Sequence, residues 1–187
     1  IPMVATFGAM FFVPYPEERP PESRRPGDSS ARYGANMRPV GESWDKPESP
    51  IFCYPYARSR EALEELRKND EWDPYNGIKL EYIDPTTGGS AMPTMSTFLQ
   101  SLPKGFKTEA YQTTENTVYS PVEGTGRVIA GEPGEEIILE WKPRDIFAIP
   151  CWVPYRLEAD SDATLFSYTD RTAQQKLGLW REMRGNA

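Results

Sequence analysis

The chain has 187 residues, and its 21 Lys and Arg against 28 Asp and Glu give a formal net charge of -7. This acidic balance argues against a nucleic-acid partner, and no apolar run reaches the roughly 20 residues of a membrane span. The sequence contains no histidine. It therefore excludes imidazole acid–base catalysis, His-dependent serine or cysteine triads, and imidazole metal sites.

The N-terminal part is expected to contain little regular structure. Residues 1–13 form an apolar run that fits either a buried strand or a short helix. Residues 14–77 are rich in proline and predict an irregular connection, extended over its first part. One helix is expected within it, at residues 59–69, with Ser59 as N-cap and with Leu63 and Leu66 on one face.

The remainder, residues 78–187, favours short strands. Apolar–polar alternation predicts strands at 78–83 and, more loosely, at 95–102. Further short strands, separated by Gly, Pro or Asp, are expected at 117–122, 126–130, 136–141, 145–149 and 163–168. Strands at spacings of about ten residues indicate an all-β sandwich or barrel. The last run, Ala173 to Met183, predicts a short amphipathic helix that carries Leu177 and Trp180.

The two cysteines, Cys53 and Cys151, fit either buried free thiols or one disulfide. Free thiols are favoured because nothing in the sequence marks the chain as secreted, and a cytoplasmic location is expected. Cys151 stands between Pro150 and Trp152 without a cation nearby in the sequence. We therefore expect an inert, buried thiol there.

Two spaced blocks of residues resemble the conserved blocks of the cupin superfamily. The first block consists of Gly105, Tyr111, Thr113, Thr117 and Gly124, and the second contains Pro150 and Tyr155. The resemblance implies an all-β cupin fold, which is a double-stranded β-helix or jelly-roll barrel, with an irregular Pro-rich N-terminal arm and short flanking helices. The barrel would occupy residues 78–187.

The positions that hold the metal in metal-binding cupins are changed in this sequence. By resemblance, Tyr111 and Thr113 occupy the slots of two histidines, Thr117 that of a glutamate, and Tyr155 that of the last histidine. Alternate residues of a strand point to one face, so two such histidines could meet one ion. Neutral hydroxyls are poor substitutes for imidazole. We expect no metal and no catalytic residue in this chain.

Longer segments resemble the C-terminal half of gentisate 1,2-dioxygenases and of related enzymes that cleave salicylate and 1-hydroxy-2-naphthoate. They include DPTTGGSAMPTM, YQTTENTVYSPVEGTGR, PRDIFAIPCW and FSYTDRTAQQKLGLWRE. This resemblance implies a bicupin whose Fe(II) lies in an N-terminal cupin, with residues 1–13 as the end of that cupin. It also implies that the present half is structural and builds a homo-oligomer, a tetramer in the family.

The hydroxyl-bearing slots leave two interpretations open. Tyr111, Thr113, Tyr119 and Tyr155 could simply fill the barrel interior. They could instead line a remnant pocket in which Arg127 holds a small aromatic acid, as in a stand-alone, non-enzymatic cupin. Glu123 and Asp145 are interpreted as turn residues. The tryptophans are expected to be core or interface anchors; they are Trp141, Trp152 and Trp180.

Overall fold

The computed structural model describes residues 28–69 and 71–185. It contains helices α2 (Asp28–Tyr33), α3 (Tyr56–Arg67) and α4 (Arg171–Lys176). Its strands are β1 (Ile78–Glu81), β2 (Ser96–Leu102), β3 (Tyr111–Thr113), β4 (Thr117–Glu123), β5 (Gly126–Ala130), β6 (Ile137–Trp141), β7 (Phe147–Ile149), β8 (Tyr155–Ala159), β9 (Ala163–Thr169) and β10 (Glu182–Arg184). The strand or helix expected at residues 1–13 lies outside the described residues.

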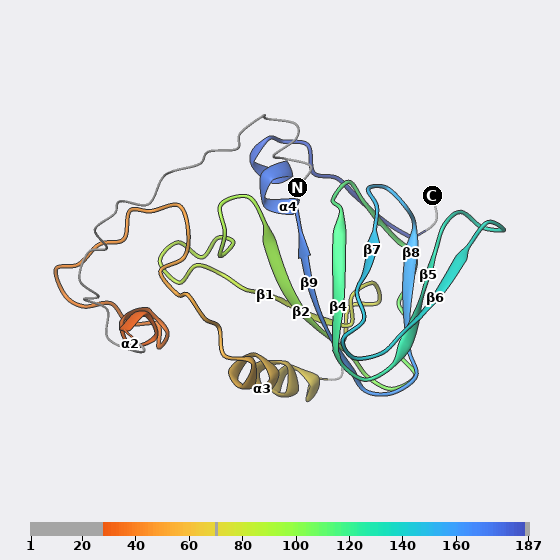
Figure 1. Ribbon diagram of the computed structural model, residues 1–187, viewed down its shortest axis with the longest axis horizontal. Helices are drawn as coiled ribbons and strands as arrows, with labels where there is room; N and C mark the ends of the chain where they lie inside the picture. Colours follow the sequence, from red (N-terminus) through yellow and green to blue (C-terminus); the bar gives the residue numbers. More distant parts are fainter. Residues whose placement is uncertain (1–27, 70, 186–187) are drawn as a thin grey trace, which may run out of the picture.

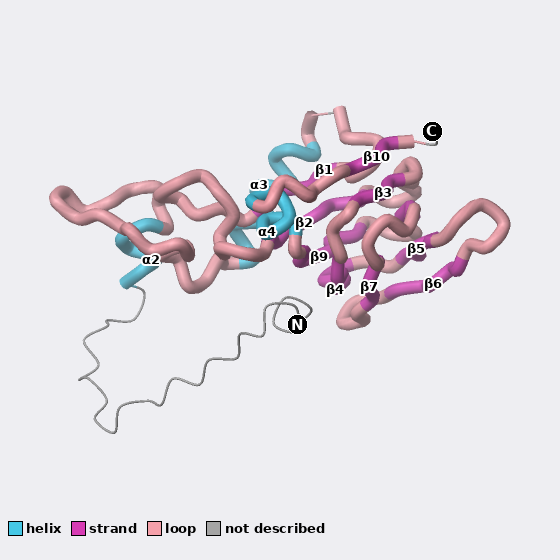
Figure 2. Tube along the Cα trace, turned by 90° about the horizontal axis from the view of Figure 1, so that it is seen from above, coloured by secondary structure: helices cyan, strands magenta, loops and turns pink. Residues whose placement is uncertain are grey.

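The strands form two antiparallel five-stranded sheets. One sheet has the order β1-β2-β9-β4-β7 and the other the order β10-β3-β8-β5-β6. Figure 1 shows the strands gathered on one side of the molecule, with α2 and the segment after it projecting from the other side. In Figure 2, α3 and α4 lie at the junction between the projecting segment and the strands. The expected all-β cupin fold is confirmed.

Alternation along the strands places one face of each sheet in a shared core. In β4, Thr117, Tyr119 and Pro121 are buried while the residues between them are partly exposed. The core cluster joins residues of both sheets, such as Leu165 of β9 and Val128 of β5, each with 0% exposure. The interior of the barrel is therefore packed with side chains.

A glycine is required where β4 turns into β5. Gly124 has a φ of +79°, and a Cβ there would lie 2.3 Å from the carbonyl oxygen of Asp162. Positive φ is accessible to glycine at little cost, so this position of the first block serves the backbone. It allows the β4–β5 connection to pass close to the β8–β9 turn.

The helix boundaries differ from the sequence expectation. Helix α3 begins at Tyr56, after Pro55 as N-cap, so the expected Ser59 cap is wrong. Proline fixes φ near the value that a helix entry needs, and this explains the earlier start. Leu63 anchors the helix with 1% exposure. Helix α2 also lies within the arm that was expected to be extended.

The expected helix from Ala173 to Met183 is wrong over its second half. Helix α4 ends at Lys176, and Gly178 follows with a φ of +70°. The chain then forms β10, in which Glu182 pairs with Thr113 and Arg184 with Tyr111 on β3. Pairing with an available sheet edge therefore overrides the helical periodicity of this segment.

Candidate functional site

The tyrosines of the altered ligand slots meet inside the barrel. Tyr111 of β3, Tyr119 of β4 and Tyr155 of β8 are between 1% and 5% exposed. The hydroxyls of Tyr119 and Tyr155 are hydrogen-bonded at 2.9 Å. Tyr111 and Tyr155 pack edge to face with ring centres 5.9 Å apart, and Tyr119 stacks on Phe147 at 5.0 Å. These rings occupy the interior, as the first of the two interpretations has it.

The donor chemistry of these slots does not suit a transition metal. Burial raises the pKa of Tyr111, Tyr119 and Tyr155 above the usual value of 10.0, so the phenols stay neutral at neutral pH. Thr113 and Thr117 are buried, and the Thr113 hydroxyl accepts the backbone N–H of Glu115 at 3.3 Å. Residues 28–69 and 71–185 contain no cluster of three His, Cys, Asp or Glu side chains suited to a metal ion.

Arg127 does not join the tyrosines. It lies on the exposed face of β5, next to the fully buried Val128. Its guanidinium binds Glu158 of β8 at 2.6 Å, and Lys107 approaches the same carboxylate at 3.5 Å. Because alternate residues of a strand face opposite sides, the expected role of Arg127 inside the remnant pocket has no geometric support.

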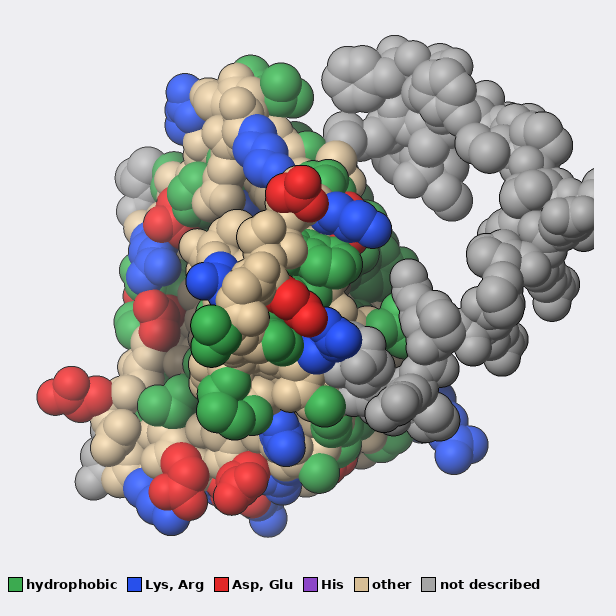
Figure 3. Space-filling model, turned by 90° about the vertical axis from the view of Figure 1, so that its left-hand side faces the viewer, with side chains coloured by type: hydrophobic (Ala, Val, Ile, Leu, Met, Phe, Trp, Pro, Cys, Tyr) green, Lys and Arg blue, Asp and Glu red, His purple; other side chains and the backbone are tan. Residues whose placement is uncertain are grey.

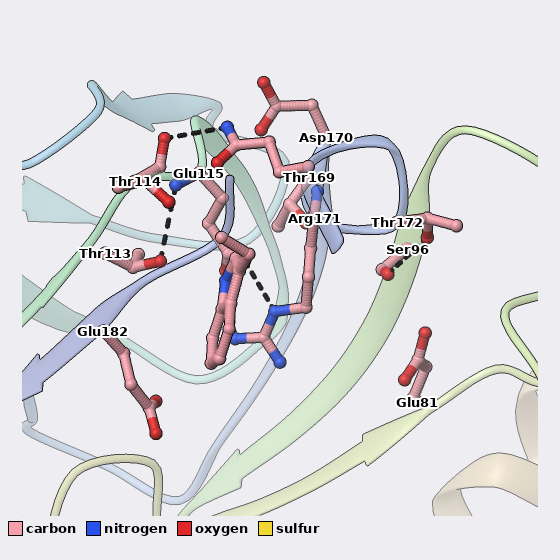
Figure 4. Close-up of polar contacts among 12 residues, drawn as sticks. Glu81, Ser96, Thr113, Thr114, Glu115, Thr169, Asp170, Arg171, Thr172 and Glu182 are labelled. Atoms are coloured by element: carbon pink, nitrogen blue, oxygen red, sulfur yellow. Dashed lines mark hydrogen bonds and ion pairs between the residues drawn. The ribbon is translucent and has the colours of Figure 1, made fainter. Parts of the chain in front are cut away.

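A buried ion pair at the start of α4 lies beside the tyrosines. Glu115, with 1% side-chain exposure, accepts hydrogen bonds from Arg171 Nε at 2.5 Å and Nη2 at 3.2 Å. Trp180 Nε1 donates to the same carboxylate at 2.8 Å. Figure 4 shows the Arg171 side chain between Glu182 and Glu81, with its dashed contact to Glu115. The pair fixes α4 and the following segment against the barrel.

The Tyr111 hydroxyl connects this ion pair to the buried tyrosines. Arg171 Nη2 donates to the Tyr111 hydroxyl at 3.3 Å, and that hydroxyl donates to Glu182 at 2.9 Å. Burial lowers the pKa of Arg171, but the charge and hydrogen bonds of Glu115, together with Tyr111 and Glu81, outweigh this, and the net pKa is raised. Arg171 is therefore a permanently charged group held at the barrel end.

A cavity of about 410 Å³ opens next to this cluster. Its cationic groups are Lys79, Arg171 and Arg184, and its carboxylates are Asp73, Glu81 and Glu182. The rings of Phe98, Tyr111 and Trp180 also line it. The lining of this cavity is therefore mainly polar, with charges of both signs.

Other candidate residues have structural positions. Asp145 accepts the backbone N–H of Lys142 at 3.0 Å in the turn after β6, where a turn residue was expected. Glu123 instead binds the Tyr56 hydroxyl at 2.6 Å and Arg60 at 3.0 Å, which ties β4 to α3. Burial and Glu123 raise the pKa of Tyr56 to about 12.

The expectations for cysteine and tryptophan are met only in part. Both cysteines are free, but Cys53 and Cys151 are exposed, so the buried site expected for Cys151 is wrong. Cys151 follows β7 in a turn, which brings it to the surface. Trp141 is a core residue with 3% exposure, whereas Trp152 is 44% exposed in the same turn as Cys151.

No local pattern in the amino-acid sequence marks the charged residues in and beside the cavity. Glu115 lies between two altered slots, and Arg171 is 56 positions further along the chain. Lys79 fits any solvated position of an alternating strand. Only the pairing of β1 with β2 and the placement of α4 bring these charges together.

The described helices include none that is long and apolar enough to cross a membrane. No family model matches the chain. A gentisate 1,2-dioxygenase of Aquipseudomonas alcaligenes is 51% identical over 184 residues, which cover 98% of this chain and 52% of that protein. A 5-aminosalicylate 1,2-dioxygenase of Comamonas sp. is 35% identical over 161 residues, or 84% of this chain and 42% of that protein.

Solved structures of ring-cleaving dioxygenases are also similar to this chain. A salicylate 1,2-dioxygenase of Pseudaminobacter salicylatoxidans superimposes with a TM-score of 0.78 at 27% identity, over 98% of this chain and 53% of that chain. A variant of that enzyme in complex with gentisate gives a TM-score of 0.84 at 26% identity, over 100% of this chain and 52% of that chain. The chain spans about half the length of the relatives that it matches. It belongs to the gentisate 1,2-dioxygenase-like family of cupin proteins.

Proposed function

We propose that this chain is the metal-free second cupin of an aromatic ring-cleaving dioxygenase, and that the Fe(II) site lies in an N-terminal cupin of the same protein. In this proposal residues 1–13 end the first cupin, residues 14–77 connect the two, and residues 78–187 form the second barrel. The observation that carries the proposal is the filled ligand layer, in which Tyr119 and Tyr155 are hydrogen-bonded to each other. Iron chemistry must then come from other residues.

An exposed apolar edge supports a structural role. Strand β6 lies at the end of its sheet, and Ile137, Ile138 and Leu139 are 63%, 60% and 47% exposed. Ile146, in the turn that follows, is 74% exposed. An apolar strand edge with this exposure favours association with another chain or domain. We propose that these residues, the β6 edge, contact the N-terminal cupin or another subunit of a homo-oligomer.

The opposite side of the molecule offers a different kind of surface. Figure 3 shows acidic and basic side chains of both signs interspersed with apolar ones on this side. In the projecting segment, Met37, Val40 and Phe52 are 66%, 104% and 95% exposed. These apolar residues are a second area that a neighbouring domain could cover. A cytoplasmic location is part of the proposal and is supported by the two free cysteines.

The intact mass and iron content of the protein isolated from its source cells test the proposal. A bicupin should have about twice the 21.2 kDa of this chain, contain iron and cleave gentisate or a related aromatic acid with O₂. A mass of 21.2 kDa together with iron-dependent ring cleavage would contradict it, because these residues would then have to hold the metal.

A second candidate function is favoured by the open cavity near Lys79. Under this second candidate function, the chain is a stand-alone, non-enzymatic cupin that binds a small aromatic acid. An intact mass of 21.2 kDa without ring cleavage would support this function instead. The two candidates are thus separated by one mass measurement and one activity assay.

A further inference from the structure

Two buried side chains of the barrel each carry an oxygen atom without a hydrogen-bond partner among the described residues. Gln100 of β2 is 1% exposed and Ser167 of β9 is 0% exposed. The Gln100 amide nitrogen donates to the carbonyl oxygen of Asn76 at 2.7 Å, but Gln100 Oε1 and Ser167 Oγ are both unpaired. A buried polar atom without a partner costs free energy, and native structures commonly satisfy such atoms with an ordered water.

The register of β2 and β9 places these two residues on the same face of their sheet. Phe98 pairs with Ser167, and Gln100 pairs with Leu165. Residues two apart on a strand point to the same side, so Gln100 and Ser167 are diagonal neighbours. They lie on the face that carries Leu165, a fully buried member of the core between the sheets. Both polar side chains therefore belong to the barrel interior.

The separation of the two oxygens is in the range that one water molecule can bridge. They form no hydrogen bond with each other, so they are more than about 3.5 Å apart. Diagonal neighbours have Cβ atoms within roughly 8 Å, and the long Gln100 side chain can shorten this distance. Two hydrogen bonds of about 2.8 Å through one water span roughly 4.5 to 5.5 Å.

We propose that one ordered water molecule is bound inside the barrel between β2 and β9, and that it bridges Gln100 and Ser167. The water donates a hydrogen bond to Gln100 Oε1 and accepts one from the Ser167 hydroxyl. Both unpaired oxygens are then satisfied, as is usual for buried waters with about two to four polar partners.

The chemistry of the unpaired atoms favours water over a metal ion. Gln100 Oε1 and Ser167 Oγ are the unpaired buried side-chain oxygens in ranges 28–69 and 71–185, and the other unpaired atoms are the ring nitrogens of Trp72 and Trp141. A hard cation takes about six oxygen ligands, whereas a water molecule needs only one donor and one acceptor.

The cavity beside β1 brings solvent close to this position. Asn76, which binds Gln100, and Phe98, which pairs with Ser167, both line that cavity. The proposed water therefore lies behind the cavity wall. The inference is independent of the proposed ring-cleaving function, because the water needs neither iron nor an organic ligand.

The test is a double-mutant cycle on the intact protein, measured by urea denaturation. Ser167→Ala and Gln100→Met should each raise the equilibrium constant of unfolding about fivefold or more, because each removes one partner of the water. The double variant should fall short of the product of the two factors by about twofold or more, because the second change acts on a water already lost. A stabilising Ser167→Ala change would overturn the proposal, and so would a purely multiplicative cycle.

Thr108→Ala provides the matched control. Thr108 is 4% exposed, and its hydroxyl accepts the backbone N–H of Leu157 directly at 2.8 Å. This variant should also be destabilised, but its factor should simply multiply with that of Gln100→Met. A coupling as large as that of Ser167 would show that the cycle does not report a shared water, and would overturn the proposal.

A crystal structure of the intact protein provides the direct observation. We expect a density peak within about 2.6 to 3.2 Å of both Gln100 Oε1 and Ser167 Oγ, and its loss in Ser167→Ala. A direct hydrogen bond between the two side chains would overturn the proposal. Absence of density between them would also overturn it.

Discussion

At the scale of single residues, the buried ion pair of Glu115 and Arg171 is the strongest electrostatic contact at the end of the barrel. Glu115 accepts three hydrogen bonds, two from Arg171 and one from Trp180. Arg171 also lies 4.8 Å from the Trp180 ring and 5.1 Å from the Phe98 ring. Such a pair holds parts of the chain together, yet removal of one partner leaves the other charge buried. The contribution of this ion pair to stability is therefore best measured by removing one of its partners.

Glu115→Gln should lower the free energy of unfolding by about 3 kcal/mol, because Arg171 would lose its counter-charge at a site with 1% exposure on the Glu115 side. Urea denaturation measures the change. Lys68→Gln is the control, since its pair with Glu65 is 68% and 63% exposed and should contribute less than about 1 kcal/mol. Equal losses in the two variants would contradict this view of the buried pair.

The ammonium of Lys79 should make stability depend on pH. Its folded-state pKa of about 8 is below the usual 10.5, so the unfolded chain binds more protons between these values. The free energy of unfolding should therefore rise as pH increases from about 8 to about 10. Above that range, tyrosines with raised pKa values, such as Tyr119, oppose the trend.

The groups that affect this titration are Arg171, Glu115, Asp73 and Glu81. Comparison with Lys79→Met, in denaturant titrations at a series of pH values, isolates the lysine. The variant should lack the rise over this range and should be more stable than the wild type at pH 7. A parallel pH profile in both proteins would show that Lys79 titrates normally.

At the scale of elements, β6 differs from the other strands. Its residues 137–140 are exposed on both faces, whereas β5 beside it buries Gly126, Val128 and Ile129. Strand pairing with β5 satisfies one edge, and the other edge has no neighbouring strand among the described residues. This combination of an unpaired edge and apolar side chains is what association would cover.

Ile138→Lys should weaken assembly of the intact protein, because it places a charge at the centre of the β6 edge, where Ile138 is 60% exposed. Sedimentation velocity should show a shift towards smaller species, with the circular dichroism spectrum unchanged. Ile83→Lys is the control, since Ile83 is 46% exposed but lies outside β6. Unchanged sedimentation of Ile138→Lys would exclude the β6 edge as an interface.

At the scale of the whole molecule, the interior of the barrel is filled by side chains from both sheets. Tyr119 and Tyr155 form a hydroxyl pair inside an aromatic cluster. The neighbouring Leu157 and Leu165 are 1% and 0% exposed, so the same layer continues into the apolar core. Dense packing of this kind stabilises the barrel.

If the protein is the proposed iron-containing bicupin, the double variant Tyr119→Phe/Tyr155→Phe should leave its iron content and ring-cleaving rate unchanged. Tyr119→Phe alone should destabilise the fold by about 1 to 3 kcal/mol, because it leaves the Tyr155 hydroxyl buried without its partner. The double variant should recover part of that loss. Loss of iron from the double variant, measured by elemental analysis, would contradict the assignment of this barrel as metal-free.

The amino-acid sequence by itself determined the fold class and most strand positions. The short segment Gly126–Ala130, which lies between Gly124 and Gly131, was predicted as a strand and forms β5 with the same bounds. The absence of histidine, together with Tyr and Thr at the altered slots, is the basis of the expectation that this barrel holds no metal. These are properties of residue type and local spacing.

Only the tertiary structure decided which charges meet. Glu115 and Arg171, 56 positions apart, are brought together by the packing of α4 against the barrel. The strand Glu182–Arg184 exists because β3 offers it an edge, although its own sequence favours a helix. The contact of Lys79 with Phe98 likewise follows from the pairing of β1 with β2. Long-range pairing and burial, which have no local period, determine such sites.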